Sequence, residues 1–265
     1  MRLILLLCLC ILQCLCSVLP VGNGGYFLLR SFLTGSFVDS DFVIAEIAVN
    51  LAVFTGIVLF LKCDIIYMLR NLISNSDGGV SRNNFAMFAI TCLFIAVSCF
   101  YRERFVESFN ALLLLGAVSF FCGIFIALIC KIGFFQLNKG KIKPINAVCF
   151  GLMQFWSLLP GASVLNTAVF SGFCCGFDEK LSCKYALSVL AFSCVSRVVF
   201  SACSFAFTGD SALSVDYAAC IFVLSLFICL KTVEIWNSNF VRFFKYFALY
   251  NCISGFVFVL LGFLG

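Results

Sequence analysis

Residues 144–177 read PINAVCFGLMQFWSLLPGASVLNTAVFSGFCCGF, a stretch of 34 residues without a charged side chain. A membrane-spanning helix needs about 20 apolar residues, so this stretch is too long for a single crossing. Pro160-Gly161 lies near its middle, and this pair of residues ends a helix. Broken backbone at membrane depth is tolerated only where protein or a water-filled cavity surrounds it. The stretch therefore predicts a re-entrant helical hairpin.

A second long uncharged stretch lies near the N-terminus, at residues 3–29, and is 27 residues long. It contains Pro20-Val21-Gly22-Asn23-Gly24-Gly25, which also predicts a helix break and a second hairpin. The segment has a competing interpretation. Met1-Arg2 followed by leucines and cysteines resembles a secretory signal peptide, although a cleaved signal has a shorter apolar core and a small-residue cleavage site.

The composition of the 265-residue chain excludes several classes of protein. It is 63% hydrophobic and 11% charged, whereas soluble domains are near 45–50% apolar and about 25% charged. The chain therefore belongs in a bilayer. It has no histidine, which excludes Ser-His-Asp triads and His-ligated metal centres, and no metal site is predicted. The net charge of +5 is spread over loops without a Lys/Arg block, so no nucleic acid partner is expected.

The remaining apolar stretches predict six transmembrane helices, at residues 42–61, 83–101, 108–130, 185–208, 213–230 and 246–264. Each hairpin is then followed by three spans, and an odd number of spans gives the halves opposite topology. The prediction is an all-α integral membrane protein, one membrane domain made of two inverted repeats (1–130 and 144–265). The linker 131–143 carries four lysines and no acid, which predicts that it is cytoplasmic. The stretch 209–216 carries two Asp and no base and is predicted to be an outer loop. Alternation from there predicts inner loops at 62–84, 178–184 and 231–245. In such folds the site lies near the bilayer midplane, here where the hairpin tips meet.

Two segments resemble the signatures of the undecaprenyl-diphosphate phosphatase family, the bacitracin-resistance phosphatases. Residues 147–163, AVCFGLMQFWSLLPGAS, are similar to A-x-x-x-G-x-x-Q-x-x-A-L-x-P-G-x-S, and residues 13–26, QCLCSVLPVGNGGY, fall on E-G-x-T-E-F-L-P-V-S-S-T-G-H. Further matches lie at residues 42–52, 110–116 and 247–250, so the resemblance runs in order along nearly the whole chain.

The resemblance implies hydrolysis of a polyprenyl diphosphate lipid, usually with a divalent cation such as Mg²⁺ or Ca²⁺. It also implies a multi-pass protein of the bacterial inner (cytoplasmic) membrane that is usually a homodimer. It assigns the catalytic work to two carboxylates and a histidine in the first signature, and to a serine and an arginine in the second. Of these reactive residues, Ser163 is the one that matches in this chain.

The other catalytic positions implied by the resemblance carry different residues. The carboxylate positions are Gln13 and Ser17, the histidine position is Tyr26, and the arginine position is Val164. Asn251 stands where a late arginine is usual, and Leu165-Asn166 replaces a Ser-Gly pair. An amide cannot take a proton, a tyrosine phenol stays protonated near neutral pH, and valine cannot clamp a phosphate. The expected result is a weak or absent hydrolytic activity.

Four further residues are predicted to bind the substrate: Asn23, Gln154, Gly161 and Arg197. Asn23 lies in a glycine-rich turn, which predicts either an anion-binding nest or a plain tight turn. Arg197 lies 13 residues from both Lys184 and Asp210, about 20 Å from either end of its helix. A charge at that depth predicts a contact with the lipid head group, a structural ion pair with Glu46, or a contact with a backbone carbonyl group.

Three functions remain open from the sequence. The first is a phosphatase that recycles the polyprenyl carrier. The second is a protein on the same scaffold that binds or flips polyprenyl phosphate without hydrolysing it. The third is a decayed remnant that retains the fold but binds no ligand.

Overall fold

The computed structural model describes residues 2–21, 26, 40–74, 85–86, 88–98, 111–132, 144–159, 161–177, 179–208 and 215–264. Within these ranges the chain is helical and contains no strand. The helices in chain order are α1 (Arg2–Val18), α3 (Ser40–Ser74), α5 (Ala111–Ile132), α6 (Pro144–Gln154), the 3₁₀ turn η2 (Phe155–Leu158), α7 (Val164–Cys174), α8 (Glu179–Thr208), α9 (Val215–Ser238) and α10 (Phe240–Leu264). A shorter apolar helix, Phe88–Ser98, lies between α3 and α5.

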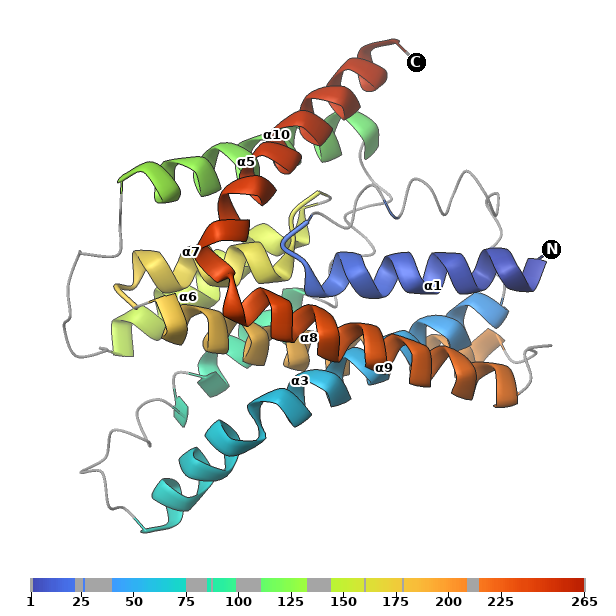
Figure 1. Cartoon of the computed structure of the whole chain (residues 1–265), viewed down its shortest axis with the longest axis horizontal. Coiled ribbons are helices and arrows are strands. Elements are labelled where there is room, and N and C mark those ends of the chain that lie inside the picture. The colour runs from blue at the N-terminus through green and yellow to red at the C-terminus, as the bar shows by residue number, and fades with distance from the viewer. Residues whose placement is uncertain are drawn as a thin grey trace.

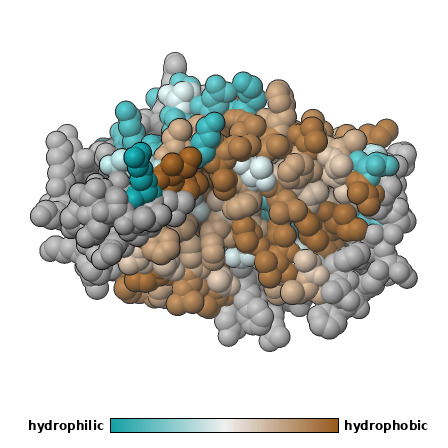
Figure 2. Space-filling model, turned by 90° about the horizontal axis from the view of Figure 1, so that it is seen from below, coloured by the Kyte–Doolittle hydropathy of each residue, from teal (hydrophilic) through white to brown (hydrophobic). Residues whose placement is uncertain are grey.

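Four stretches in the described residues are long and apolar enough to cross a membrane: Asp41–Tyr67, Glu179–Cys203, Val215–Ser238 and Phe244–Phe263. They fall in α3, α8, α9 and α10. The predicted spans at 83–101 and 108–130 correspond to the shorter apolar helices Phe88–Ser98 and Leu112–Leu128. Figure 2 shows a broad apolar face with hydrophilic residues gathered toward one edge. The chain is a multi-pass membrane protein.

Two predicted loops are wrong in part, because helices continue through charged residues. The span predicted at 42–61 belongs to a helix that runs on to Ser74, so the first part of the predicted loop 62–84 is helical. An ion pair of 2.6 Å between Lys184 of α8 and Asp64 of α3 joins this extension to α8. The predicted loop 231–245 is also mostly helix, since only Asn239 separates α9 from α10.

The helices pack in pairs that bring distant parts of the chain together. α5 lies along α10, α3 lies along both α8 and α9, and α1 contacts α9 and α3 (Figure 1). The α5–α10 contact is close because glycines face it. A Cβ added to Gly123 would lie 2.6 Å from the backbone nitrogen of Cys252, and one added to Gly116 would lie 2.5 Å from that of Val259. The two backbones therefore approach each other without intervening side chains.

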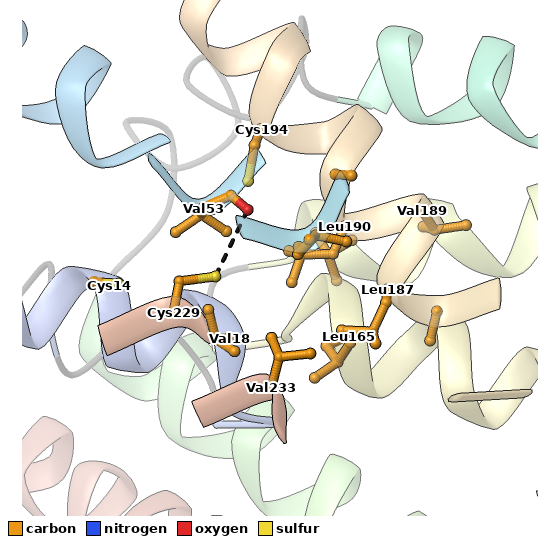
Figure 3. Packing of buried hydrophobic residues seen from close by; sticks show 14 of the residues in the cluster. Cys14, Val18, Val53, Leu165, Leu187, Val189, Leu190, Cys194, Cys229 and Val233 are labelled. Atoms are coloured by element: carbon orange, nitrogen blue, oxygen red, sulfur yellow. Dashed lines mark hydrogen bonds between the residues drawn. The ribbon is translucent and has the colours of Figure 1, made fainter. Parts of the chain in front are cut away.

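The core joins α1, α3, α7, α8 and α9. Figure 3 shows Cys14 of α1, Cys194 of α8 and Cys229 of α9 among valines and leucines of these helices. Cys14 Sγ donates to the carbonyl oxygen of Ser225 at 3.3 Å, and Cys229 Sγ donates to that of Val53 at 3.7 Å. The packing uses these three residues as small buried apolar side chains. It also makes α1 an integral part of the core.

Candidate functional site

The first predicted helix break is confirmed at Pro20. α1 ends at Val18, and the backbone nitrogen of Leu19 makes a last helical hydrogen bond of 2.9 Å to Leu15. Pro20 has no backbone N–H, so it cannot extend this ladder. The turn leaves the Pro20 carbonyl oxygen inside the protein, where Pro20 is buried.

Two asparagine side chains from distant helices meet at this carbonyl oxygen. Asn166 Nδ2 of α7 donates to it at 2.6 Å, and Asn251 Nδ2 of α10 donates to it at 3.1 Å. The donors are 146 and 231 residues away from Pro20 along the chain. Asn166 lies on the first turn of α7, just after the break of the second hairpin. The end of α1 and the start of α7 therefore meet at this contact, whereas the hairpin predicted at 3–29 extends beyond the described residues.

Three buried oxygen atoms at this point have no hydrogen-bond partner among the residues that the structure describes. They are Ser17 Oγ, Asn166 Oδ1 and Asn251 Oδ1. Their residues are 4%, 3% and 1% exposed. A buried polar atom without a partner costs about 1–3 kcal/mol, so three of them together indicate a place for a ligand or for water. We call Ser17, Pro20, Asn166 and Asn251 the Pro20 cradle.

Gln13 and Tyr26, two of the predicted site residues, lie together beside this cradle. Tyr26 Oη donates to Gln13 Oε1 at 3.1 Å, and both side chains are buried. Gln13 lies four residues before Ser17 in α1, so the two share one face of the helix. The first signature therefore forms a neutral amide–phenol pair next to a neutral cradle. None of these described side chains carries a formal charge.

Ser163 and Val164 lie at the beginning of α7. Ser163 is the N-terminal cap residue, without a side-chain cap hydrogen bond, and its carbonyl oxygen accepts from Thr167 N at 3.0 Å. It is 4% exposed and lies three residues before Asn166. Val164 is buried in the hydrophobic core. Ser163 is therefore close to the cradle along α7, whereas Val164 contributes to packing.

Gln154 and Gly161, both predicted to bind substrate, have clear packing roles. Gln154 accepts a hydrogen bond from Thr167 Oγ1 at 3.2 Å and donates one to Ser171 Oγ at 3.4 Å, which joins the two arms of the hairpin. Gly161 has φ +95°, a conformation that favours glycine, and its carbonyl oxygen accepts from Ser119 Oγ of α5 at 3.2 Å. These contacts fix the shape of the hairpin and dock its tip on α5.

Arg197 lies on α8, one turn beyond the core residue Cys194, and is partly buried within a spanning stretch. Ion pairs in the described part of the chain join Lys184 to Asp64 and Lys231 to Glu234. The ion pair between Arg197 and Glu46 stays a prediction. A contact of Arg197 with a lipid head group remains a prediction. Asn23 lies outside the described residues.

The donor set does not fit the divalent cation that the family resemblance implies. Among the described residues there is no group of three His, Cys, Asp or Glu side chains that could hold a metal ion. The oxygens that meet near Pro20 belong to amides, a hydroxyl and a phenol, all neutral. Calcium and magnesium sites in proteins rely on carboxylate ligands. No reaction step through a divalent cation follows from these residues.

The sequence identifies Asn166 and Asn251 only as replacements in the family pattern and does not predict that they converge. A signal was present, because both are amides within uncharged apolar stretches. Polar side chains at membrane depth face the protein interior or a functional site. That rule selects both asparagines, but it does not show which atom they contact.

The fold and the site define the class of this protein. It is a polytopic helical membrane protein in which two broken segments meet at a buried polar site.

Residues 6–257 match the family model described as bacitracin resistance protein BacA, and the chain belongs to that family. Its relatives include undecaprenyl-diphosphatase 2 of Clostridioides difficile (strain 630), which is 23% identical over 271 residues, covering 96% of this chain and 92% of the relative. An undecaprenyl-diphosphatase of Geobacter metallireducens is 26% identical over 182 residues, covering 66% of each chain. One from Methanococcus maripaludis (strain C5) is 23% identical over 177 residues, covering 66% of this chain and 69% of the relative.

Proposed function

We propose that this chain binds a polyprenyl phosphate or diphosphate lipid in the bacterial cytoplasmic membrane and holds or flips it with little hydrolysis. The observation that carries the proposal is the hydrogen bond of 3.1 Å between Tyr26 and Gln13. The resemblance places a histidine and a carboxylate at these two positions. The two side chains satisfy each other as a neutral pair, and neither is an acid or base that works near neutral pH.

The magnitude of the expected loss supports binding over catalysis. General acid–base catalysis contributes about 10²–10⁴-fold to a rate, and electrostatic stabilisation of the transition state contributes about as much again. Gln13, Ser17, Tyr26 and Val164 remove both contributions from this site. Membership of the family still favours the lipid as ligand, since the lipid class is a property of the scaffold as well as of the reactive groups.

The packing supports two inverted repeats in one membrane domain, with residues 1–130 and 144–265 as the halves. The helix after the first hairpin, α3, lies along the helix after the second, α8. The last helix of the first half, α5, lies along the last helix of the second, α10. Equivalent helices of the two halves are thus neighbours. A homodimer is part of the same proposal.

A second candidate is residual hydrolysis of undecaprenyl diphosphate. It is favoured by Ser163, which lies at the start of α7 three residues before the cradle residue Asn166. It is also favoured by the name of the C. difficile relative, which the match covers almost end to end.

One pair of measurements on the protein purified in detergent tests both candidates. Binding of undecaprenyl phosphate is measured by equilibrium titration, and phosphate release from undecaprenyl diphosphate is measured with Mg²⁺ and with Ca²⁺. Saturable binding without release supports the proposal. Rapid release that Ser163→Ala abolishes supports the second candidate and overturns the first. Arg197→Gln is expected to weaken lipid binding more than Arg197→Lys, which keeps the charge but loses the fork-shaped donor group.

A further inference from the structure

The two asparagines of the Pro20 cradle have a fixed orientation. A carbonyl oxygen can only accept hydrogen bonds, so both side chains must present Nδ2, not Oδ1, to Pro20. Asn251 Nδ2 uses its second hydrogen for the carbonyl oxygen of Phe247, at 2.8 Å. The Pro20 oxygen already accepts two bonds, which occupies both of its lone pairs. The cradle therefore offers a ligand the two Oδ1 atoms, which are acceptors.

Both Oδ1 atoms lie near the Pro20 oxygen. The Nδ2 atoms are 2.6 and 3.1 Å from the Pro20 oxygen. The two atoms of a carboxamide are about 2.3 Å apart, so each Oδ1 lies within about 5.5 Å of that oxygen. Ser17 is three residues before Pro20, one turn away at the end of α1, and its Oγ is the third buried oxygen without a partner among the described residues. A hydroxyl oxygen also has lone pairs for a ligand.

The unpartnered oxygen atoms of the cradle favour a positive ligand, because they are acceptors. The last carbonyl groups of a helix lack intrahelical partners and carry about half a negative charge together. The cradle lies at this end of α1 and also at the first turn of α7, whose N-terminus carries the opposite partial charge, so the two helix dipoles offset each other there. None of its side chains carries a charge, and its amide hydrogens toward Pro20 are already used. The lone pairs of these oxygen atoms repel an anion, whereas the same atoms can coordinate a cation.

We infer that the Pro20 cradle is a binding site for a monovalent cation, Na⁺ in the first instance. Its ligands are Asn166 Oδ1, Asn251 Oδ1 and Ser17 Oγ, with carbonyl oxygens at the end of α1 completing the shell. Broken helices in membrane transporters use unwound carbonyls and helix C-termini in this way. A divalent ion does not suit the cradle, because its higher charge requires carboxylate ligands that the described residues do not supply.

The cation site adds a consequence that rests on the proposed function. A lipid phosphate carries negative charge into a site where the arginine position is Val164 and the other described groups are neutral. A Na⁺ ion in the cradle offsets that charge. Binding of the ion and of the lipid are then coupled, and each raises the affinity for the other by the same factor.

The test measures the ion first, without lipid. The full-length protein in detergent is heated in NaCl and in choline chloride at equal ionic strength, and ²²Na⁺ binding is measured by equilibrium dialysis. The expected result is saturable binding of one ion per chain and a Tm that rises with NaCl concentration but not with choline chloride. Ser17→Ala should weaken ²²Na⁺ binding at least 10-fold.

The matched control is Ser182→Ala, which also removes a buried hydroxyl without a hydrogen-bond partner in the described structure, but at the start of α8 against Gly172. It should leave ²²Na⁺ binding unchanged. Equal Tm curves in both salts together with no saturable ²²Na⁺ binding by the unaltered protein would show that the cradle holds water only, and would overturn the inference. Equal losses in the two serine variants would also overturn it.

A second measurement separates this inference from the proposed function. Undecaprenyl phosphate is titrated with and without Na⁺, and a gain in affinity of at least fivefold is expected with the ion. Sodium binding without any lipid binding supports the cation site and contradicts the proposed function. Lipid binding without sodium binding supports the proposed function and contradicts the cation site.

Discussion

The hydrogen bond from Tyr26 to Gln13 makes the reactive end of the first signature a neutral pair. Restoring the family residues with Gln13→Glu, Ser17→Glu, Tyr26→His and Val164→Arg together should raise phosphate release from undecaprenyl diphosphate at least 100-fold over the unaltered chain. Residues that act as one catalytic unit are not additive, so each single change should have little effect. The measurement is a phosphate-release assay with Mg²⁺. A single variant that matches the fourfold variant would contradict the interpretation.

Asn251 holds the Pro20 turn against α10 through the hydrogen bond from Nδ2 to the Pro20 oxygen, and the second hydrogen of Nδ2 bonds to Phe247 within α10. Asn251→Ala should lower the free energy of unfolding by about 1–3 kcal/mol, because the buried Pro20 oxygen loses one of its two donors. The matched control is Asn239→Ala, which removes an exposed asparagine whose Nδ2 contacts Ser238 at 2.8 Å. That change should cost less than about 0.5 kcal/mol. Denaturation in mild detergent, followed by circular dichroism, measures both.

At the scale of single helices, close contact between α5 and α10 depends on glycine. Gly123→Val places a Cβ 2.6 Å from the backbone nitrogen of Cys252, and a backbone atom cannot move aside as a flexible side chain does. The pair must separate, and we expect a loss of about 1–3 kcal/mol. Gly262→Ala is a milder control, since its nearest neighbour, the nitrogen of Leu113, is 3.1 Å away. Thermal melts of both variants in detergent test whether Gly123→Val lowers the Tm more than Gly262→Ala. Equal Tm values would contradict this expectation.

The extent of α3 illustrates what local hydropathy misses. The apolar pattern ends near residue 61, but the helix continues to Ser74. Lys184 meets Asp64 at 2.6 Å from a neighbouring helix, and this tertiary ion pair is absent from any local pattern. A change in polarity marks where a helix leaves the membrane, whereas the helix itself ends where its hydrogen bonds end.

At the scale of the whole molecule, the topology gives a direct prediction. Residues 144–177 should enter and leave on the cytoplasmic side, because α6 and α7 form a hairpin joined through Gln154. With the native cysteines removed, single thiols introduced as Gly140→Cys and Lys180→Cys should be labelled from the same face by a membrane-impermeant reagent. Labelling from opposite faces would contradict the re-entrant hairpin. A thiol at Ser211, on the predicted outer loop, serves as the control for the opposite face.

Local sequence was sufficient to predict the class of protein and the places where its helices break. Hydropathy and proline positions are local properties, so the membrane setting, the breaks near Pro20 and Pro160-Gly161, and the family signatures could all be found in the printed chain. The contact between Gln13 and Tyr26 could have been predicted, since both residues lie in the first signature.

The contacts of the buried amides depend on tertiary packing. Asn166 and Asn251 meet at one carbonyl oxygen across separations of 146 and 231 residues, and no local pattern fixes such a contact. It depends on how α7 and α10 are rotated and shifted against the end of α1, which packing of all the helices sets together. The same packing gave Gln154 and Gly161 their roles in the hairpin, and it left three oxygen atoms in the Pro20 cradle without a partner among the described residues.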